Sequence, residues 1–350
     1  MVFGLADSLR LVALGAALLV LTACAQPEGK VAVGVGTSAY RFKDAQPYAY
    51  MLKPYAEMAA LAYSDPQFQT RGFCPDAALY RKASNVDADH SKPDNDAAAR
   101  WIDDLSTAGW TCASGHVGRY ECDPDACVGG LQFHLWRRGC SEAVLAFRGT
   151  DSRETGPLIT RGDLVSNLRW FVTLPIDDEY DQARRAALGV LKDVQKWRCG
   201  PRLRLITTGH SLGGGLAQHA AFADKRFSYV YAFDPSPVTG LFDITWEDRQ
   251  WSVKKLGIDR VYESGEVLSL PRYLVSGVFA TSPCQPRIRI VRFATSTAPS
   301  LIERHRIKNL ADGLGNLAGP RRKPAPKLPT GFANAVSCDF TGNDPELADP

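Results

Sequence analysis

The sequence predicts an α/β fold in which a central, mostly parallel sheet is covered by helices on both faces. Short apolar and β-branched runs, typical of buried strands, recur along the second half of the chain, at 203–208, 229–233, 259–262 and 288–293. Runs with helical spacing of apolar residues stand between and before them, at 55–63, 101–105, 180–191 and 212–223. Strands that alternate with helices along one chain favour a parallel sheet with crossover helices.

A serine between two glycines directly follows the first of these strands, in the run Gly209-His210-Ser211-Leu212-Gly213. The helix-like run from Leu212 places this serine at a sharp strand-to-helix turn. Such a nucleophile elbow holds its serine in a strained conformation with the Oγ exposed above the sheet. An ordinary glycine-rich turn is the alternative, which the position between strand and helix disfavours. We therefore predict that Ser211 is a nucleophile.

A nucleophilic serine needs a base, and α/β-hydrolases supply it from a histidine later in the chain. Of the six histidines, only His219 and His305 follow Ser211. His219 lies eight residues into the predicted helix, which carries it away from the Oγ, so we expect a packed or surface histidine there. His305 follows the strand-like run 288–293 after a polar connection. The sequence therefore favours His305 as the base.

The acid that orients the base has two candidates. Asp234 follows the strand-like run 229–233, and Glu266 lies in a turn after the run 259–262. The usual winding of the sheet places the acid in the loop before the strand that precedes the histidine, which favours Glu266. Asp234 remains the alternative acid.

Four landmarks together resemble the class 3, or fungal-type, lipases of the α/β-hydrolase superfamily. They are the run Ala146-Phe147-Arg148-Gly149-Thr150, the elbow at 209–213, the stretch 260–271 and His305. The resemblance extends over roughly 45–310 and implies a triad of Ser211, Glu266 and His305, without a cofactor. It also implies an oxyanion hole formed by Thr150 and the backbone N–H of Leu212.

The chain departs from that family at two positions. The family usually has an aspartate where this chain has Glu266, and it has a glycine near the turn where this chain has Asp234 between Phe233 and Pro235. Glutamate reaches further than aspartate by one methylene. Both departures keep the identity of the acid open.

The N-terminal residues predict export. Residues 11–21 form an apolar run that is too short to span a bilayer and suits the core of a signal peptide. Leu21-Thr22-Ala23-Cys24 resembles the lipobox of bacterial lipoproteins, in which the cysteine is lipidated. We therefore expect a cell-envelope lipoprotein of the periplasm or outer membrane, held on a membrane surface through Cys24. Plain secretion is the alternative.

Cysteine usage agrees with an oxidising compartment. Eight cysteines remain besides Cys24, an even number without metal-like spacing, which fits up to four disulfides: Cys74, Cys112, Cys122, Cys127, Cys140, Cys199, Cys284 and Cys338. The cluster over 112–140 is expected to staple the segment before the Phe-Arg-Gly-Thr strand. The pairing itself is not determined by the spacing.

Length and composition predict one catalytic domain over 45–318, after a signal peptide at 1–23 and a tether at 24–44. A basic, proline-rich tail, 319–350, is expected to be extended and solvated.

The net charge of only +3 argues against a nucleic-acid partner. The acidic segment 87–98 lacks the glycine and glutamate of an EF-hand loop, so no metal is expected. The sequence does not indicate an oligomeric state.

These observations predict a serine hydrolase that cleaves carboxylic esters of lipids, of lipase, phospholipase or esterase type, through an acyl-enzyme. The alternatives are another serine-triad activity, such as a thioesterase or peptidase, and a non-catalytic lipid-binding lipoprotein.

In the lipases that the chain resembles, the segment after the oxyanion strand covers the site. Residues 151–178 show helical spacing of apolar residues and are therefore expected to form a lid, with a fixed surface helix as the alternative.

Overall fold

The computed structural model describes residues 26–35, 40–70, 72–86, 93–118, 120–121, 130–149, 179–236, 256–269, 272 and 287–320. Several sequence predictions lie outside these residues: the signal peptide with Cys24, Thr150, the lid at 151–178 and almost all of the tail. Within the described ranges, no helix combines the length and the apolar character needed to cross a membrane.

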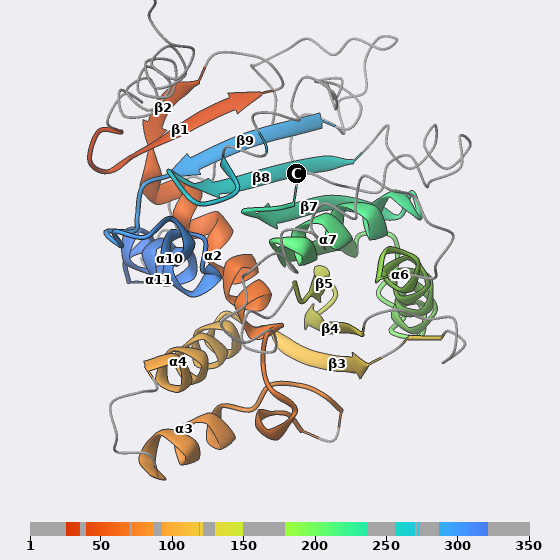
Figure 1. The fold of residues 1–350 in the computed structure, drawn as a ribbon. Coiled ribbons are helices and arrows are strands. Elements are labelled where there is room, and N and C mark those ends of the chain that lie inside the picture. Colours follow the sequence, from red (N-terminus) through yellow and green to blue (C-terminus); the bar gives the residue numbers. More distant parts are fainter. Residues whose placement is uncertain are drawn as a thin grey trace, which may run out of the picture.

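The described strands form one nine-stranded sheet in the order β2-β1-β9-β8-β7-β6-β5-β4-β3 (Figure 1). Neighbouring strands from β5 through β6, β7 and β8 to β9 are parallel, and the pairs toward both edges are antiparallel. The strands are β1 (Lys30–Val35), β2 (Arg41–Asp44), β3 (Thr111–Gly118), β4 (Leu131–Arg138), β5 (Glu142–Phe147), β6 (Arg204–His210), β7 (Phe227–Phe233), β8 (Gly257–Glu263) and β9 (Arg287–Phe293). The parallel central strands that the sequence predicts are thus confirmed, within a sheet whose outer pairs are antiparallel.

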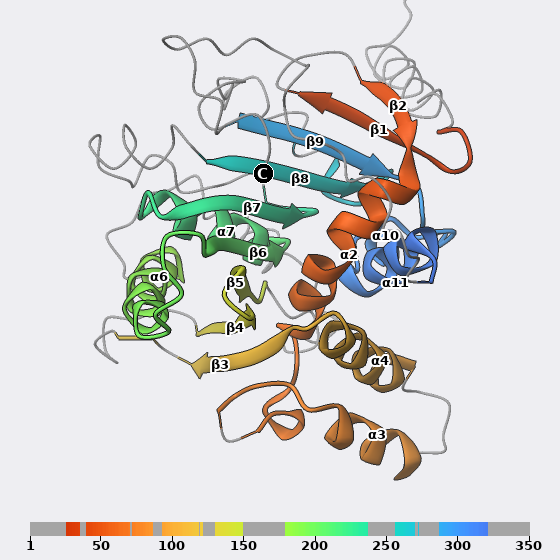
Figure 2. The same cartoon turned by 180° about the vertical axis from the view of Figure 1, so that it is seen from behind.

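Helices cover both faces of this sheet. Two separate apolar cores form: one beneath α2, α4 and α11, and the other beneath α6 and α7. In both views α2, from the N-terminal part of the chain, lies beside the C-terminal α11 (Figures 1 and 2). The helices are α2 (Ala45–Leu61), the 3-10 helix η1 (Pro66–Phe68), α3 (Ala77–Val86), α4 (Pro93–Thr107), α6 (Glu179–Gln195), α7 (Leu212–Phe222), α10 (Leu301–Arg304) and α11 (Ile307–Ala318). Helices on both faces are the arrangement that the sequence predicts.

The two cores follow from the side-chain alternation of each strand. In β5, Val144 and Ala146 belong to the core beneath α2, whereas Leu145 and Phe147 belong to the core beneath α6 and α7. All six residues of β5 are buried, because helices cover both of its faces. A strand that is apolar on both faces is therefore the signal of a central position in this sheet.

The sheet begins before residue 45. Residues 30–35 and 41–44, which fall within the expected tether, form β1 and β2, and β1 pairs antiparallel with β9. Val31 and Val33 are spaced as in a strand, and Val31 is fully buried in the core beneath α2. The segment that the sequence assigns to a tether thus contributes to the domain.

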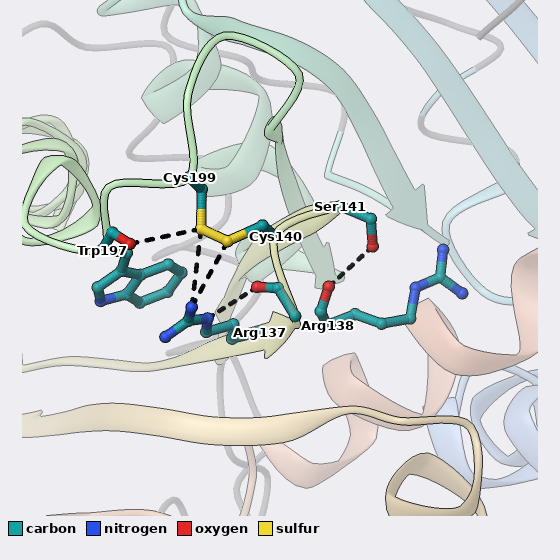
Figure 3. The surroundings of a disulfide bond; sticks show 7 residues. Arg137, Arg138, Cys140, Ser141, Trp197 and Cys199 are labelled. Atoms are coloured by element: carbon teal, nitrogen blue, oxygen red, sulfur yellow. Dashed lines mark hydrogen bonds between the residues drawn. A yellow bond between two sulfur atoms is a disulfide. The ribbon is translucent and has the colours of Figure 1, made fainter.

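Two disulfides occur in the described part of the chain, Cys74–Cys112 and Cys140–Cys199. The second joins the turn before β5 to the segment before β6, and the guanidinium of Arg137 lies against both sulfur atoms (Figure 3). Cys112 and Cys140 thus each pair with a cysteine outside the 112–140 cluster, so these two bonds tie that segment to other parts of the domain.

Candidate active site

The site is built at the carboxyl ends of the central parallel strands, where α/β sheets place their ligands. Ser211 directly follows β6, Asp234 directly follows β7, and Glu266 lies in the turn after β8. His305 comes after β9, between α10 and α11. The fold therefore brings together four residues that are far apart in the sequence.

Ser211 occupies a strained turn between β6 and α7. Its φ of 56° and ψ of −122° lie outside the regions that non-glycine residues ordinarily adopt. The two glycines of the motif are sterically required: a Cβ at Gly209 would lie 2.2 Å from the carbonyl oxygen of Gly213, and one at Gly213 would lie 2.5 Å from the carbonyl oxygen of Phe147. This geometry is that of a nucleophile elbow.

His305 connects the serine to a carboxylate. Its Nε2 lies 3.1 Å from Ser211 Oγ, and its Nδ1 lies 2.8 Å from Glu266 Oε2. Because an ionised carboxylate only accepts hydrogen bonds, Nδ1 carries the proton in the neutral ring, and Nε2 accepts from the serine hydroxyl. A ring nitrogen that can accept a proton therefore lies beside the serine hydroxyl, and a carboxylate lies against the opposite nitrogen of the same ring.

Glu266 is held by several donors in addition to His305. The Leu268 backbone N–H donates to Oε2 at 2.8 Å, the Ser269 hydroxyl donates to Oε1 at 3.0 Å, and Arg272 lies 2.7 Å from Oε1. Burial raises the pKa of Glu266, but the hydrogen bond from His305 and the charge of Arg272 oppose burial, and the pKa is lower than usual. Glu266 is therefore ionised at neutral pH.

Asp234, the alternative acid, is fully buried and has a φ of 39°. Its Oδ1 accepts a hydrogen bond from the backbone N–H of Glu263 at 2.9 Å and lies 4.0 Å from Arg272. The structure shows no hydrogen bond between Asp234 and the His305 ring within the described residues. Burial and the charge of Glu266 raise the pKa of Asp234 well above its usual value. Of the two candidate acids, only Glu266 directly contacts the histidine.

His210, the residue before the serine, also contacts the base. Its Nε2 lies 2.7 Å from the carbonyl oxygen of His305, and its Nδ1 lies 3.0 Å from the Tyr63 hydroxyl. A carbonyl only accepts, so Nε2 of His210 carries the proton and Nδ1 accepts from Tyr63. Burial lowers the pKa of His210 well below its usual value, which keeps the ring neutral.

His210, Asp234 and His305 each place a potential metal-ligand atom within 4.8 Å of the other two. Both ring nitrogens of His210 are already used, one as a donor to the His305 carbonyl and the other as an acceptor from Tyr63. A metal ligand needs a free lone pair, so His210 does not supply one in this arrangement. His210 is thus committed to hydrogen bonds with the His305 carbonyl and with Tyr63.

Of the two predicted oxyanion donors, only Leu212 lies within the described residues. It opens α7, and the first N–H groups of a helix have no partner within the helix. The strand that leads to Thr150 lies beside the elbow, because a Cβ at Gly149 would lie 2.5 Å from the carbonyl oxygen of His210. A backbone N–H at the start of a helix suits a developing negative charge on a bound carbonyl oxygen.

Sequence reasoning did not identify Tyr63, His210 or Arg272 as parts of the site. His210 directly precedes the serine, and Arg272 directly follows the stretch 260–271, so both are next to motifs with assigned roles. Tyr63 gave no signal, because it comes from the residues after α2, almost 150 positions before its partner. His219 is buried on α7 against the ring of Tyr180, as expected for a packed helix histidine.

Comparison with known proteins identifies a phospholipase-like segment. The family model of the Tle-like phospholipase domain matches residues 131–241, about a third of the chain, which run from β4 past Ser211 and Asp234. No curated protein matches the sequence. This match agrees with the resemblance to lipases that the sequence motifs indicate.

Two solved lipase structures are similar to this chain at low identity. Lipase II from Rhizopus niveus is 16% identical with a TM-score of 0.35, and the match covers 69% of this chain and 78% of that one. The native lipase propeptide complex from Rhizomucor miehei is 14% identical with a TM-score of 0.38, and the match covers 71% of this chain and 67% of that one. The strand order of the described sheet and the serine elbow after β6 are typical of the α/β-hydrolase fold, and residues 131–241 match a phospholipase-like family model.

Proposed function

We propose that the protein hydrolyses carboxylic esters of lipids, with Ser211 as nucleophile, His305 as general base and Glu266 as the acid that orients it. The observation that carries this proposal is the continuous chain of contacts from Ser211 Oγ through the His305 ring to Glu266 Oε2, at 3.1 and 2.8 Å. The strained elbow at Ser211 supports the role of nucleophile. The phospholipase-like match supports a lipid ester as the substrate class.

The reaction follows from the protonation states of these groups. Ser211 Oγ attacks the acyl carbon while its proton passes to His305 Nε2, and Glu266 stabilises the imidazolium that forms. His305 then gives the proton to the leaving alcohol, and the ester C–O bond breaks to leave an acyl-serine. A water molecule, deprotonated by His305, hydrolyses this intermediate and restores the hydroxyl of Ser211.

The tetrahedral intermediates carry a negative charge on the former carbonyl oxygen. We assign its stabilisation to the Leu212 N–H and to Thr150, the residue that follows Gly149 beside the elbow. Loss of one such donor typically costs about 3–4 kcal/mol of transition-state stabilisation. We also propose that the protein acts outside the cytoplasm on a membrane surface, tethered through Cys24; the two disulfides agree with export.

The test uses a fluorophosphonate probe together with a panel of esters. The wild-type protein should be labelled and should hydrolyse phospholipid, triacylglycerol or short-chain esters, and Ser211→Ala should remove both labelling and hydrolysis while the circular dichroism spectrum is unchanged. Without the hydroxyl, only binding and the oxyanion hole remain, and kcat should fall by about 10⁴-fold or more. Hydrolysis by Ser211→Ala within tenfold of wild type would contradict the proposal.

A further inference from the structure

Asp234 has a backbone conformation that favours glycine. Its φ of 39° lies in the left-handed region, which is strained for most residues with a side chain and costs glycine almost nothing. The chain places a carboxyl group at this position and buries it fully, which is itself unfavourable. Such a residue calls for a functional explanation.

The carboxyl of Asp234 faces the same partners as Glu266. One of its oxygens lies within 4.8 Å of a ring nitrogen of His305, and its Oδ1 lies 4.0 Å from Arg272, which is 2.7 Å from Glu266. The Oδ2 atom has no hydrogen-bond partner among the described residues. A second carboxyl group is therefore buried beside the base, with one oxygen uncommitted.

The charges of the cluster decide which carboxyl is ionised. Five titratable or charged groups face or contact Asp234: Glu266, Arg272, Glu263, His210 and His305. Glu263 is tied separately to the backbone and hydroxyl of Thr295 and to the Ser296 N–H. His210 is held neutral by burial, so among the described residues Arg272 is the nearest fixed positive charge for the two carboxyls. One buried cation balances one carboxylate, so Glu266 is charged and Asp234 keeps its proton.

We propose that Asp234 is a second acid of the site, a positioning residue that keeps its proton while Glu266 is charged and replaces Glu266 as the counter-charge to His305 when Glu266 is lost. The inference rests on the proposed function. When Glu266 becomes neutral, Arg272 loses its counter-charge, the Asp234 O–H bond breaks and the proton leaves to water. To accept a hydrogen bond from the His305 ring, the resulting carboxylate of Asp234 must move about 2 Å closer to it, or one water molecule must bridge the two groups.

The test is a double-mutant cycle with the full chain and the soluble ester p-nitrophenyl butyrate. Glu266→Gln should lower kcat/KM by about 10²-fold, less than the roughly 10⁴-fold that loss of a triad acid costs when nothing replaces it. Asp234→Asn should lower it about threefold, because the amide still accepts from the Glu263 N–H. In the double variant kcat/KM should fall about 10⁴-fold, which is about thirty times more than the two single losses multiplied together.

A pH profile separates this role from a structural one. In Glu266→Gln the activity should increase as rising pH ionises Asp234, and this increase should be absent from the double variant. Glu57→Gln provides the matched control, since Glu57 is also a buried carboxyl but lies on α2 beside Lys53. Added to Glu266→Gln, it should change neither the activity nor the profile. If Asp234→Asn does not fold, Asp234→Gly, which suits the positive φ, takes its place.

Three outcomes overturn the inference. The first is a loss of kcat/KM in the double variant that equals the product of the two single losses. The second is a pH profile of Glu266→Gln that matches that of the double variant. The third is a change on adding Glu57→Gln to Glu266→Gln that is as large as the change on adding Asp234→Asn. If Ser211→Ala is inactive in the same assay and one of these is found, only the role of Asp234 fails. If Ser211→Ala remains active, the proposed function itself fails.

Discussion

The hydroxyl of Tyr63 lies 3.0 Å from Nδ1 of His210, and the opposite nitrogen of the same ring lies 2.7 Å from the carbonyl oxygen of His305. A tyrosine that follows α2 thus reaches the backbone of the proposed base through one neutral imidazole. The ring of His210 also lies against the ring of His305, with centroids 4.7 Å apart. The position of the base therefore depends on a residue that takes no part in the proposed proton transfers.

Removal of this hydroxyl should weaken catalysis without weakening substrate binding. In Tyr63→Phe, Nδ1 of His210 loses its donor, so the ring is less firmly oriented against the His305 carbonyl. We expect kcat to fall about tenfold, the equivalent of about 1.4 kcal/mol, with KM changed less than twofold. Tyr50→Phe, on α2, removes a hydroxyl away from this network and is the control. Equal kcat values for the two variants would contradict the role assigned to Tyr63.

Arg272 should set the pH range over which the site is active. Its guanidinium lies 2.7 Å from Glu266 and lowers the pKa of that carboxyl. In Arg272→Gln the pKa of Glu266 therefore rises, and protonation of Glu266 removes the counter-charge of His305 at a higher pH. We expect the acid limb of kcat/KM to move to higher pH, and the maximum to fall about tenfold, which pH profiles of initial rates would measure.

Arg226→Gln is the matched control for that prediction. Arg226 pairs with Asp224 on the surface, after α7, and should leave the pH profile unchanged. An acid limb in Arg272→Gln that coincides with the wild-type limb would mean that Arg272 only packs against Tyr262, 4.3 Å from its ring centroid.

Much of this fold was predictable because its central strands are apolar on both faces. β6, β7, β8 and β9 each lie where a β-branched or aromatic run stands in the sequence, and the glycines of the elbow fix the turn at Ser211. β1 and β2 were missed. β2 is an edge strand with every residue exposed, so it carries no apolar pattern, and β1 is a short strand that pairs with it. Strands of that kind are recognised by their pairing, which a single sequence does not show.

The serine and the histidine of the candidate site were predictable because few residues of those types stand at suitable places in the chain. Ser211 and His305 could be selected from chain order, and the structure places them 3.1 Å apart. The choice between Glu266 and Asp234 could not be made from spacing, because both follow strands that end at the same edge of the sheet. Their environments differ in the donors that surround each carboxyl, and those donors come from separate segments of the chain.

The disulfide Cys140–Cys199 should stabilise the fold without affecting catalysis. It closes a loop of 59 residues at the amino ends of β5 and β6, opposite the sheet edge that carries Ser211. Replacing both cysteines with serine should lower the free energy of unfolding by about 4 kcal/mol, the loop-closure entropy of a loop of that length. Urea denaturation would measure the loss.

Two results would count against that assignment. One is an unchanged urea midpoint in the double serine variant. The other is a lower kcat at a temperature where the variant is still folded, which would mean that the bond also positions the elbow. Adding reductant to the wild-type protein should lower the free energy of unfolding further, because it also breaks the Cys74–Cys112 disulfide.

Glu57 should make the fold less stable as the pH rises. This carboxyl lies in the core beneath α2 with 2% of its surface exposed, and the nearest cation, Lys53, is 3.6 Å away, beyond hydrogen-bond distance. Burial raises the pKa of Glu57 to about 8, from 4.5 in the unfolded chain. Between these two values the folded state binds more protons than the unfolded state, so stability is complete below pH 4.5 and decreases up to about pH 8.

Glu57→Gln removes this dependence because the amide fills the same space and does not ionise. At pH 5 the variant and the wild type should have similar free energies of unfolding, and at pH 8 the variant should be more stable by about 3 kcal/mol. Lys53 keeps its other partner, Asp104, at 2.8 Å, so the substitution leaves no unpaired cation. Urea unfolding of both proteins at the two pH values provides the measurement. A difference in stability that is the same at pH 5 and pH 8 would show that Glu57 is ionised in the folded protein, and that Lys53 stabilises its charge despite the burial.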